Sequence, residues 1–577
     1  MNSTSSLFSI GSFNFKLNHL LIIGILSIAF STSFLIRSQP ADFGWQLNEF
    51  DPFFNYRATQ YILDNGFDSY FQWHDEFSWY PSGRDVSSNA QVMLHFTAAI
   101  TYWIFGAGGN LYDFTILFPV IFGSLTSIVV FALVRVIGGT TAGLFSALLF
   151  SISLPIIIRG QLGWFKSEPL GLFFSILAVY LFLSGLNSKN PKITISKIIG
   201  AGIFIIFGLS AWGGDQFFIL PLGIFILTLP FLQSNHKFLI WTIPLFTASI
   251  MISSLAFERL GIHFITGFGG VSLIIPTIFL VSCIIIQNKS KENYKQRNGL
   301  LLLILIIIIG SGFLIIGSDS DLISLPSHRY LNAMNPFLTT TDPLTDSVSE
   351  HATTTLPQSF IFHSILMIFA GLGVWIILKN PKKYSYVKND MISFSLIFGF
   401  FGVYVSSTFV RLEVFASLSV IILSSLGLTF LLKELFSNKI KDRSAKNFII
   451  KLPFIVGLII LLTIPLVYPI DSNVISIPKN PPTIMNGGST FTISSTDWID
   501  SLEWIKNNTP KDAVIGAWWD YGYWIQTLAE RATLADNSTT HDGMIKKIAK
   551  AFLSSPDEGR DILLEMHKWK SWKKLVK

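Results

Sequence analysis

Residues 410–432 read VRLEVFASLSVIILSSLGLTFLL, in which Arg411 precedes an almost uncharged apolar run. A helix needs about 20 apolar residues to cross the hydrocarbon core of a bilayer, and the run 412–432 meets that length. The chain contains fourteen runs of this kind, which fall near 20–36, 91–106, 114–134, 138–158, 169–186, 198–212, 216–232, 238–256, 264–286, 299–317, 359–378, 390–410, 412–432 and 452–469. The sequence therefore predicts a mostly α-helical, polytopic membrane protein.

The composition agrees with this prediction. Of the 577 residues, 50% are hydrophobic and 13% are charged, whereas a soluble protein carries about 25% charged residues. The mean hydropathy is +0.54 and the formal net charge is +6. The single cysteine, Cys283, excludes an intrachain disulfide. The first apolar run lacks the cleavage pattern of a signal peptide, so we expect a retained first span.

The distribution of basic residues tests the number of spans, because Lys and Arg gather in cytoplasmic loops. Four loops rich in Lys or Arg are predicted to be cytoplasmic, namely 187–197, 287–298, 379–389 and 433–451. The polar segments 37–90 and 318–358 are predicted to lie outside. These assignments agree if the run 91–106, which is short and carries His95, is a non-spanning helix. Thirteen spans then remain in the plasma membrane, with a cytoplasmic N-terminus.

The predicted domains follow from these spans. Residues 1–470 form the polytopic domain, with outer loops at 37–113, 159–168 and 318–358. Residues 471–577 form an extracytoplasmic domain. Three of its segments predict a mixed α/β fold: the helical spacing of SSTDWIDSLEWIKNNT with Asp497 as its cap, the buried strand AVIGA, and the amphipathic HDGMIKKIAKAFLSS.

The terminal domain carries a cluster of aromatic and polar residues, WWDYG, at residues 518–522. Two adjacent indoles supply rigid walls and N–H donors, the Asp520 carboxylate accepts hydrogen bonds, and the glycine frees the backbone to turn. This combination favours the binding of a small side chain with a hydroxyl group. The alternative, for an aromatic pair taken alone, is a surface turn beside a buried strand.

Four further polar residues lie on the predicted outer face. Asp51 precedes a proline; a carboxylate held there can bind a divalent cation or accept an amide proton, although a lone Asp is more often a helix cap. Glu168 begins the span 169–186 and alternatively only pairs with the helix dipole. Glu350 lies in a polar loop, where a lone Glu is usually solvated. Arg411 either clamps phosphate or snorkels to the surface.

Taken in order, these segments resemble one known family. The chain carries DPFFNYR from Asp51, then WYPSGR, GWFKSE, SVSE at 347–350, VRL at 410–412, and finally WWDYG. This succession over thirteen predicted spans is similar to the catalytic subunit of oligosaccharyltransferase, most closely to its single-subunit archaeal form. The resemblance covers nearly the whole chain and implies the C-type glycosyltransferase fold.

The resemblance implies a glycosyltransferase that performs protein N-glycosylation. Such an enzyme moves an oligosaccharide from a polyprenyl (dolichyl) phosphate or pyrophosphate to the Asn of an Asn-X-Ser/Thr sequon. Trp518, Trp519 and Asp520 would hold the Ser/Thr hydroxyl of the acceptor. Asp51 and Glu350 would accept hydrogen bonds from the acceptor amide, whose rotation out of plane costs up to about 20 kcal/mol.

The resemblance also implies a metal, a lipid and a set of partners. Asp51 and Glu168 would hold Mn²⁺ or Mg²⁺, and Arg411 would bind the lipid phosphate. The partners would be the lipid-linked oligosaccharide, acceptor polypeptides and membrane lipid, without nucleic acid. The chain would act as a single subunit.

Two departures from the family pattern change these expectations. The second outer loop normally holds a metal-sharing acidic pair, but here it reads Lys166-Ser167-Glu168. An ammonium at this place repels a divalent cation or itself stabilises the leaving phosphate, so we predict weakened or altered metal dependence. No D-x-x-K or M-x-x-I motif follows WWDYG at the usual distance, so we expect the domain 471–577 to be truncated.

Two alternatives to an active oligosaccharyltransferase remain open. One is a paralogue that binds sequons but is weakly active or inactive, which Lys166 and the missing motif favour. The other is a different polyprenyl-phosphate-sugar glycosyltransferase, which leaves SVSE and WWDYG without a role. A transporter is disfavoured, because no inverted repeat is apparent and the charges cluster at the predicted outer face.

Overall fold

The computed structural model describes residues 6–10, 13–317, 348–379, 387–436, 445–487 and 493–575. Most of the predicted outer loop 318–358, apart from the segment that holds Glu350, lies outside the described residues. The chain forms two compact units. Unit 1 comprises residues 1–36, 122–158 and 170–477, and unit 2 comprises residues 37–121, 159–169 and 478–577. Unit 2 thus combines the first and second outer loops with the C-terminal segment.

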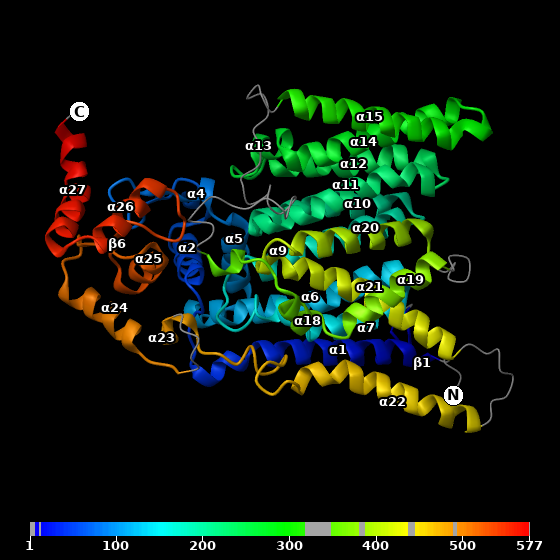
Figure 1. The fold of residues 1–577 in the computed structure, drawn as a ribbon, viewed down its shortest axis with the longest axis horizontal. Helices are drawn as coiled ribbons and strands as arrows, with labels where there is room; N and C mark the ends of the chain where they lie inside the picture. The colour runs from blue at the N-terminus through cyan, green and yellow to red at the C-terminus, as the bar shows by residue number, and fades with distance from the viewer. Residues whose placement is uncertain are drawn as a thin grey trace. The chain divides into compact units, whose positions relative to one another are not determined.

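Unit 1 is an assembly of long helices (Figure 1). A two-stranded antiparallel hairpin of β1 (Ser6–Ile10) and β2 (Phe13–Lys16) precedes them. The helices are α1 (Leu17–Arg37), α6 (Leu111–Gly138, which begins in unit 2), α7 (Thr140–Ser151), α8 (Leu154–Ile157), α9 (Glu168–Leu186, which also begins in unit 2), α10 (Pro191–Ala211), η2 (Gly213–Phe218), α11 (Ile219–Leu232), α12 (His236–Ser254), α13 (Gly261–Thr266), α14 (Phe268–Lys289), η3 (Glu292–Tyr294), α15 (Lys295–Gly317), η4 (Ser349–His351), α18 (Leu356–His363), α19 (Leu366–Lys379), α20 (Asn389–Ser406), η5 (Val410–Leu412), α21 (Glu413–Leu435) and α22 (Ala445–Val467).

The prediction of a polytopic, mostly helical fold is confirmed. Within the described residues, nine helices are long and apolar enough to cross a membrane, and α18 with α19 adds a pair bent by 82°. The predicted run 138–158 instead forms two helices, α7 and α8. The break falls just before Pro155, because proline lacks the N–H that a continuing helix would use.

Residues 410–432, which hold Arg411 and the apolar run after it, lie at the centre of unit 1. Of the residues in the most apolar part of Val410–Leu435, which comprises η5 and α21, 94% are buried, and α21 packs against α7, α19 and α20. Glycines on its neighbours permit close approach. A Cβ on Gly373 of α19 would lie 2.5 Å from the Leu423 carbonyl oxygen, and one on Gly402 of α20 would lie 1.9 Å from Ser419 Oγ. Small residues at such crossings let membrane helices pack backbone against backbone.

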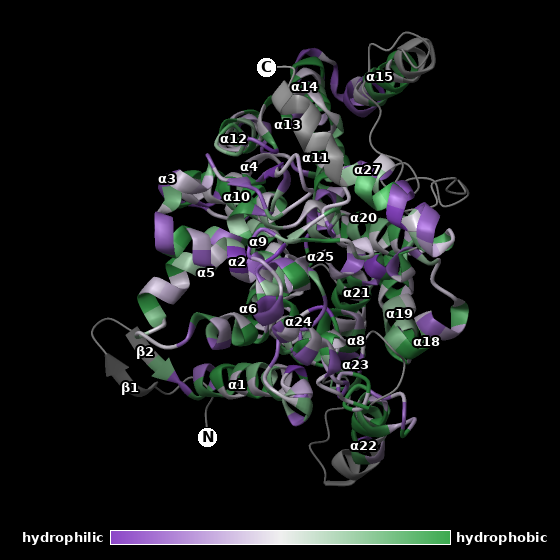
Figure 2. Ribbon diagram, turned by 90° about the vertical axis from the view of Figure 1, so that its left-hand side faces the viewer, coloured by the Kyte–Doolittle hydropathy of each residue, from purple (hydrophilic) through white to green (hydrophobic). Residues whose placement is uncertain are grey.

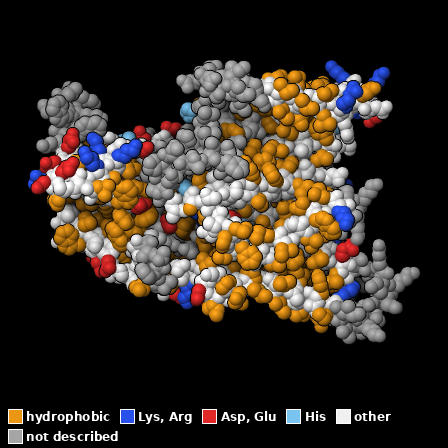
Figure 3. All heavy atoms as spheres, in the orientation of Figure 1, with side chains coloured by type: hydrophobic (Ala, Val, Ile, Leu, Met, Phe, Trp, Pro, Cys, Tyr) orange, Lys and Arg blue, Asp and Glu red, His pale blue; other side chains and the backbone are white. Residues whose placement is uncertain are grey.

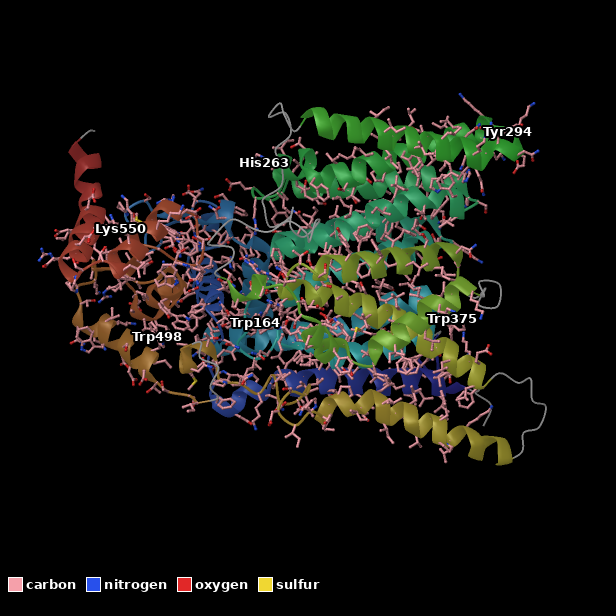
Figure 4. The ribbon with its side chains drawn as sticks, in the orientation of Figure 1. Trp164, His263, Tyr294, Trp375, Trp498 and Lys550 are labelled. Atoms are coloured by element: carbon pink, nitrogen blue, oxygen red, sulfur yellow. The ribbon has the colours of Figure 1, made fainter. Side chains whose placement is uncertain are left out.

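Aromatic and basic residues mark one end of the unit 1 helices. Figure 4 places Tyr294 and Trp375 at this end and His263 toward the opposite one. The Arg297 guanidinium lies 4.3 Å from the Tyr294 ring, and the Lys379 ammonium lies 4.5 Å from the Trp375 ring. Hydrophobic side chains cover the flank of these helices in Figure 3. An apolar flank with aromatic and basic residues at its end is the pattern of a membrane-spanning unit.

Unit 2 begins with the first outer loop. Its elements there are η1 (Gln39–Phe43), α2 (Asp51–Asn65), α3 (Phe67–Tyr70), β3 (His74–Asp75), β4 (Arg84–Asp85), α4 (Val86–Asn89) and α5 (Val92–Phe105). Strands β3 and β4 pair antiparallel. In Figure 2, α2 carries many hydrophilic residues, whereas α12 and α14 of unit 1 are mostly hydrophobic.

The predicted non-spanning run 91–106 forms α5, which belongs to unit 2 and packs against α2. Its His95 is fully buried. His95 Nδ1 lies 2.7 Å from the Tyr70 hydroxyl, and His95 Nε2 lies 2.9 Å from the Asn55 side-chain oxygen. Both ring nitrogens therefore bind partners of unit 2, and His95 is a packed core residue.

The C-terminal segment has the predicted mixture of helices and strands. Its elements are α23 (Thr483–Asn486), α24 (Asp497–Asn508), β5 (Val514–Ile515), η6 (Trp519–Tyr521), α25 (Gly522–Trp524), the π-helix η7 (Ile525–Ala529), β6 (Ala532–Thr533), α26 (Asp542–Leu553) and α27 (Pro556–Leu575). Strands β5 and β6 pair parallel.

Two local predictions for this segment were wrong. Thr496, not Asp497, precedes α24 as its N-cap residue, and its hydroxyl donates to Asp500. The strand from AVIGA covers only β5 and is half-exposed, because β6 alone pairs with it and no further strand covers it in the described residues.

Candidate functional site

Asp51 occupies the first turn of α2 in unit 2. The proline that follows it takes an early helix position, where its missing N–H costs no hydrogen bond. The Asp51 side chain is 44% exposed. It does not cap the helix, because Phe50 is the N-cap residue and makes no side-chain cap bond. The helix-cap alternative for Asp51 is therefore wrong, and its carboxylate is accessible for other interactions.

The second outer loop is tied by its backbone to the first. The Asn48 amide donates to the Gly163 carbonyl at 2.9 Å, and the Asn55 side chain donates to the Phe165 carbonyl at 2.8 Å. Gly163 has φ +77°, and a Cβ there would lie 2.3 Å from the Gln46 carbonyl oxygen. Since the tied residues 48 and 55 flank Asp51, the loop is held against the start of α2.

This arrangement brings Lys166 onto Asp51. The Lys166 ammonium lies 3.1 Å from Asp51 Oδ2 and 3.9 Å from Glu49 Oε2. It also lies 5.0 Å from the ring centroid of Trp164, labelled in Figure 4. The Lys166 side chain is only 10% exposed. The departure from the family pattern noted in the sequence is thus a buried cation in direct contact with the proposed catalytic carboxylate.

Glu168 faces a second basic side chain. It is the first residue of α9 and is fully buried. The Arg159 guanidinium, which is also buried, lies 3.4 Å from Glu168 Oε1. A carboxylate in the first turn of a helix also interacts favourably with the helix dipole, which is the alternative role that the sequence offered for Glu168.

The two residues expected to hold a divalent metal therefore each contact a cation, Lys166 for Asp51 and Arg159 for Glu168. Among the described residues, no three His, Cys, Asp or Glu side chains are grouped so that they could hold a metal ion. Hard divalent cations prefer sites built from several oxygen ligands. The donor set present here does not fit the metal site that the resemblance implies.

WWDYG forms a tight helical turn in unit 2. Trp518 precedes η6, and Gly522 begins α25. Gly522 has an ordinary helical φ of −56°, so the expectation that this glycine frees the backbone to turn was wrong. Its role is close packing, because a Cβ on Gly522 would lie 2.5 Å from Asp536 Cβ and 2.6 Å from the Ala535 carbonyl oxygen.

Aromatic stacking anchors this turn. The Tyr521 ring lies 4.5 Å from Trp498 of α24, labelled in Figure 4. The Trp524 ring lies 4.6 Å from Phe50, and its indole N–H donates to the Glu49 carbonyl at 3.0 Å. This last bond links the WWDYG turn directly to the residues that precede Asp51.

The polar groups of the turn have two notable features. Trp519 is 8% exposed, and its buried indole N–H finds no hydrogen-bond partner among the described residues. Burial raises the pKa of Asp520 to about 6, a hydrogen bond from Trp518 opposes this rise, and the nearby Asp51 charge adds to it. The structure thus brings Trp518, Trp519 and Asp520 into one turn and places Asp51 within electrostatic reach of it.

A buried polar network, missed by the sequence interpretation, supports the turn. The Arg57 guanidinium donates to both Asp75 oxygens, at 2.9 and 2.5 Å, and to Gln526 Oε1 at 3.0 Å. Gln526 Nε2 in turn donates to Asp536 Oδ2 at 2.9 Å. The network joins α2 and the first outer loop to the segment after WWDYG.

Asp536 is the inner end of this network. It is fully buried and accepts hydrogen bonds from Ser78 and from Ser538 Oγ. Burial alone would raise the pKa of Asp536, but the Arg84 charge and these hydrogen bonds hold the pKa below its usual range. An ionised carboxylate therefore lies directly behind Gly522. No sequence pattern around Asp536 indicated this role.

Arg84 lies directly after a turn of the first outer loop. Gly83 before it has φ +71°, as a turn requires. The Arg84 side chain, however, is buried; its guanidinium lies 4.2 Å from the Phe54 ring and donates to the Tyr523 hydroxyl at 2.8 Å. It therefore packs under the WWDYG turn rather than facing solvent.

Glu350 and Arg411 pair with each other within unit 1. Glu350 lies in η4 and Arg411 in η5, and Glu350 Oε1 is 2.7 Å from Arg411 Nη1. The Val410 amide donates to the Ala352 carbonyl at 2.9 Å and holds the two turns together. The side chains are 23% and 25% exposed. The alternative of a solvated Glu350 is wrong, because its carboxylate is paired with Arg411.

Comparisons with known proteins identify the family of this chain. Residues 20–338 match the family model described as "Oligosaccharyl transferase STT3, N-terminal", and residues 510–563 match the "STT3/PglB/AglB core domain". The rice "Dolichyl-diphosphooligosaccharide--protein glycosyltransferase subunit STT3B" is 26% identical over 585 residues, covering 94% of this chain and 79% of that protein. The Dictyostelium discoideum subunit STT3 is 26% identical over 573 residues, covering 95% and 76%.

Solved structures share the fold. An Archaeoglobus fulgidus oligosaccharyltransferase, AglB, in complex with an inhibitory peptide and a dolichol-phosphate, has a TM-score of 0.69 and 17% identity. The alignment covers 92% of this chain and 68% of that one. The apo form of the same organism's enzyme gives a TM-score of 0.70 at 18% identity. With more than half of the chain matched by the family model, the chain belongs to the STT3 family of oligosaccharyl transferases.

Proposed function

We propose that this chain transfers an oligosaccharide from a polyprenyl (dolichyl) phosphate or pyrophosphate to the Asn of Asn-X-Ser/Thr sequons. The reaction class is inferred from family membership, because the family is named for oligosaccharyl transfer to protein. The WWDYG turn is the observation that supports a sequon with a Ser or Thr hydroxyl as the acceptor. It combines the Trp519 N–H, which has no partner among the described residues, with the Asp520 carboxylate.

The acceptor hydroxyl is both a donor and an acceptor, so it matches this turn. The Trp519 N–H donates to the hydroxyl oxygen, and ionised Asp520 accepts a hydrogen bond from the hydroxyl group. The reacting Asn lies two residues from the bound Ser or Thr. Binding the hydroxyl therefore positions the amide nitrogen, which is an entropic contribution to the rate.

The carboxylates and Arg411 complete the proposed reaction. Asp51 and Glu350 accept hydrogen bonds from the acceptor amide and favour rotation of its C–N bond, which releases the nitrogen lone pair. The nitrogen bonds to the sugar C1 as the bond from C1 to the phosphate oxygen breaks, and the amide proton leaves to a carboxylate. The phosphate keeps the electron pair and is held by Arg411.

The resemblance also implies that the reaction depends on a divalent metal. Its ligands would be Asp51 and Glu168, and a bound Mn²⁺ or Mg²⁺ would neutralise charge on the leaving phosphate. Both carboxylates face basic side chains, so the donor set does not fit.

The setting of the reaction is also proposed. The N-terminus is cytoplasmic, and the active site and unit 2 face outward from a cell membrane. The end of unit 1 that carries Tyr294, Trp375 and their basic neighbours would then be the cytoplasmic end. We propose that the chain acts alone, as in an archaeal enzyme, although its eukaryotic relatives are named as subunits.

The experiment uses the full chain in detergent, a lipid-linked oligosaccharide extract and an Asn-X-Thr peptide. Mass spectrometry of the peptide is expected to show glycan on the Asn, and none on a Gln-X-Thr control peptide. Trp519→Phe, which lacks the N–H, should lose most transfer. Peptide binding without any transfer would instead identify the inactive paralogue, which the contact between Lys166 and Asp51 favours.

A further inference from the structure

We infer that Lys166 is a built-in cation that does the charge-neutralising work of a divalent metal in this chain. The inference deepens the proposed function and rests on it for the reaction. It also predicts a property that can be measured without any reaction, namely that the site does not take up Mn²⁺ while Lys166 is present.

The charges around the site support this inference. Two basic side chains of one loop, Arg159 and Lys166, face the two carboxylates that the resemblance assigns to a metal. Lys166 additionally faces Glu49 at 3.9 Å. The negative charge that would attract a divalent ion is thus largely neutralised by protein, and a second cation beside the ammonium would be repelled.

The position of Lys166 is built into the fold. The backbone of its loop is tied on one side to Asn48 and on the other to Asn55, and the Trp164 ring lies under the ammonium at 5.0 Å. A cation over an indole face is attracted by the ring. These contacts hold Lys166 near Asp51 and limit the directions in which it can swing away.

An ammonium can perform the role chemically. Lysine carries a compact positive charge and three N–H donors on a flexible stem, and it is an established phosphate ligand in proteins. In the proposed transfer, the Lys166 ammonium donates hydrogen bonds to the departing phosphate oxygen and keeps all of its protons. No bond to Lys166 forms or breaks, so the balance of the reaction above is unchanged.

A purely structural role for Lys166 makes a different prediction. If the lysine only locked Asp51 in place, a neutral side chain of similar length would preserve transfer once the fold is intact. If the lysine supplies charge, that same variant should lose transfer, and a divalent cation should restore part of it.

The binding arm uses the purified full chain, with Mn²⁺ as the probe and electron paramagnetic resonance as the readout. The parent should bind no Mn²⁺ at this site at micromolar concentration. Lys166→Asp should bind one Mn²⁺ about 100-fold more tightly than the parent, because it replaces a repelling charge by a ligand. Lys479→Gln is the matched control: it removes another paired lysine of unit 2, half-exposed beside Asp42 at 2.7 Å, and should resemble the parent.

The activity arm measures peptide glycosylation with and without EDTA. The parent and Lys479→Gln should transfer at equal rates in both conditions. Lys166→Gln should transfer at least about tenfold more slowly in EDTA and gain rate with added Mn²⁺. Thermal unfolding of each variant checks that the fold is retained.

The outcomes separate the inference from the proposed function. One Mn²⁺ bound by the parent and lost in Asp51→Asn, or parental transfer abolished by EDTA, would overturn the inference. Equal Mn²⁺ binding by folded Lys166→Asp and the parent would also overturn it. If no protein transfers under any condition, the proposed function fails, and the binding arm alone still decides whether Lys166 excludes the metal.

Discussion

Asp51 in unit 2 and Glu350 in unit 1 each face a basic side chain, Lys166 at 3.1 Å and Arg411 at 2.7 Å. The two pairs differ in burial: the Lys166 side chain is 10% exposed and the Arg411 side chain is 25% exposed. They also differ in chemistry, because a guanidinium has five N–H donors in a planar fork and can hold a carboxylate and a phosphate together. We interpret the first pair as a fixed charge and the second as a phosphate clamp.

The largest expected effect tests the fixed-charge pair. Asp51→Asn should lower the rate of transfer by about 10³-fold, because it removes the acceptor of the amide proton and weakens the ion pair with Lys166. The rate is measured by mass spectrometry of the sequon peptide. Asp64→Asn, at an exposed carboxylate of the same helix, should keep parental activity. Retention of more than about a tenth of the activity in Asp51→Asn would be incompatible with the assigned role.

The second prediction tests the clamp. Arg411→Gln should raise the KM for the lipid-linked substrate by about 100-fold and leave the KM for the peptide nearly unchanged, because only the phosphate loses its partner. Arg411→Lys should restore part of the loss, since lysine binds phosphate without the bidentate fork. Arg259→Gln, an exposed arginine of unit 1, serves as the control. An equal rise in both KM values would show that Arg411 supports the fold of the site and not the lipid.

The third prediction concerns the turn that carries the acceptor residues. Gly522→Ala should lower the free energy of unfolding of unit 2 by about 1–3 kcal/mol, because the added methyl group overlaps Asp536. Gly543→Ala is the matched control, since a Cβ on this helical glycine of α26 meets nothing within 4 Å. That variant should be neutral or more stable by up to about 1 kcal/mol. Chemical denaturation followed by tryptophan fluorescence compares the two, and equal stabilities would contradict the packing role of Gly522.

The smallest expected effect is on pH dependence. The pKa of Asp520 is raised to about 6. Above that pH, Asp520 is ionised and can accept a hydrogen bond from the sequon hydroxyl. Peptide affinity should be retained at pH 7 and be about tenfold weaker at pH 5, where about one Asp520 in ten is ionised. Fluorescence titration with an Asn-X-Thr peptide measures this, and Asp520→Asn should remove the pH dependence. Stronger binding at pH 5 than at pH 7 in the parent would reverse the assigned role.

The sequence predicted the parts of this fold that depend on local composition. Most predicted spans coincide with one long helix in the structure, because about 20 apolar residues have few other stable arrangements in a membrane. The predicted spans 138–158 and 359–378 are exceptions, since each forms two helices. The run 91–106 was distinguished from the predicted spans because it is short and contains His95. The helix α24 was predicted from its period, although its cap was misplaced by one residue.

The site was predicted less completely, because its contacts join distant segments. The sequence singled out Asp51 and Lys166, but their contact depends on backbone bonds between the two outer loops. The burial of Asp536 could not be predicted, because its partners Ser78 and Gln526 are recognised only in the folded structure. In the sequence, a buried Asp cannot be distinguished from a surface Asp. The sequence suggested that Gly522 lets the backbone turn. The structure shows that a glycine is required there because Asp536 leaves no room for a Cβ.

The most direct test of charge neutralisation by Lys166 is a single-turnover assay of the parent chain in excess EDTA, with lipid-linked oligosaccharide and an Asn-X-Thr peptide. We expect glycan on the Asn of the peptide at the same rate as without EDTA, because the Lys166 ammonium and Arg411 supply the positive charge. Peptide that stays unmodified in EDTA and becomes glycosylated when Mn²⁺ is returned would contradict it.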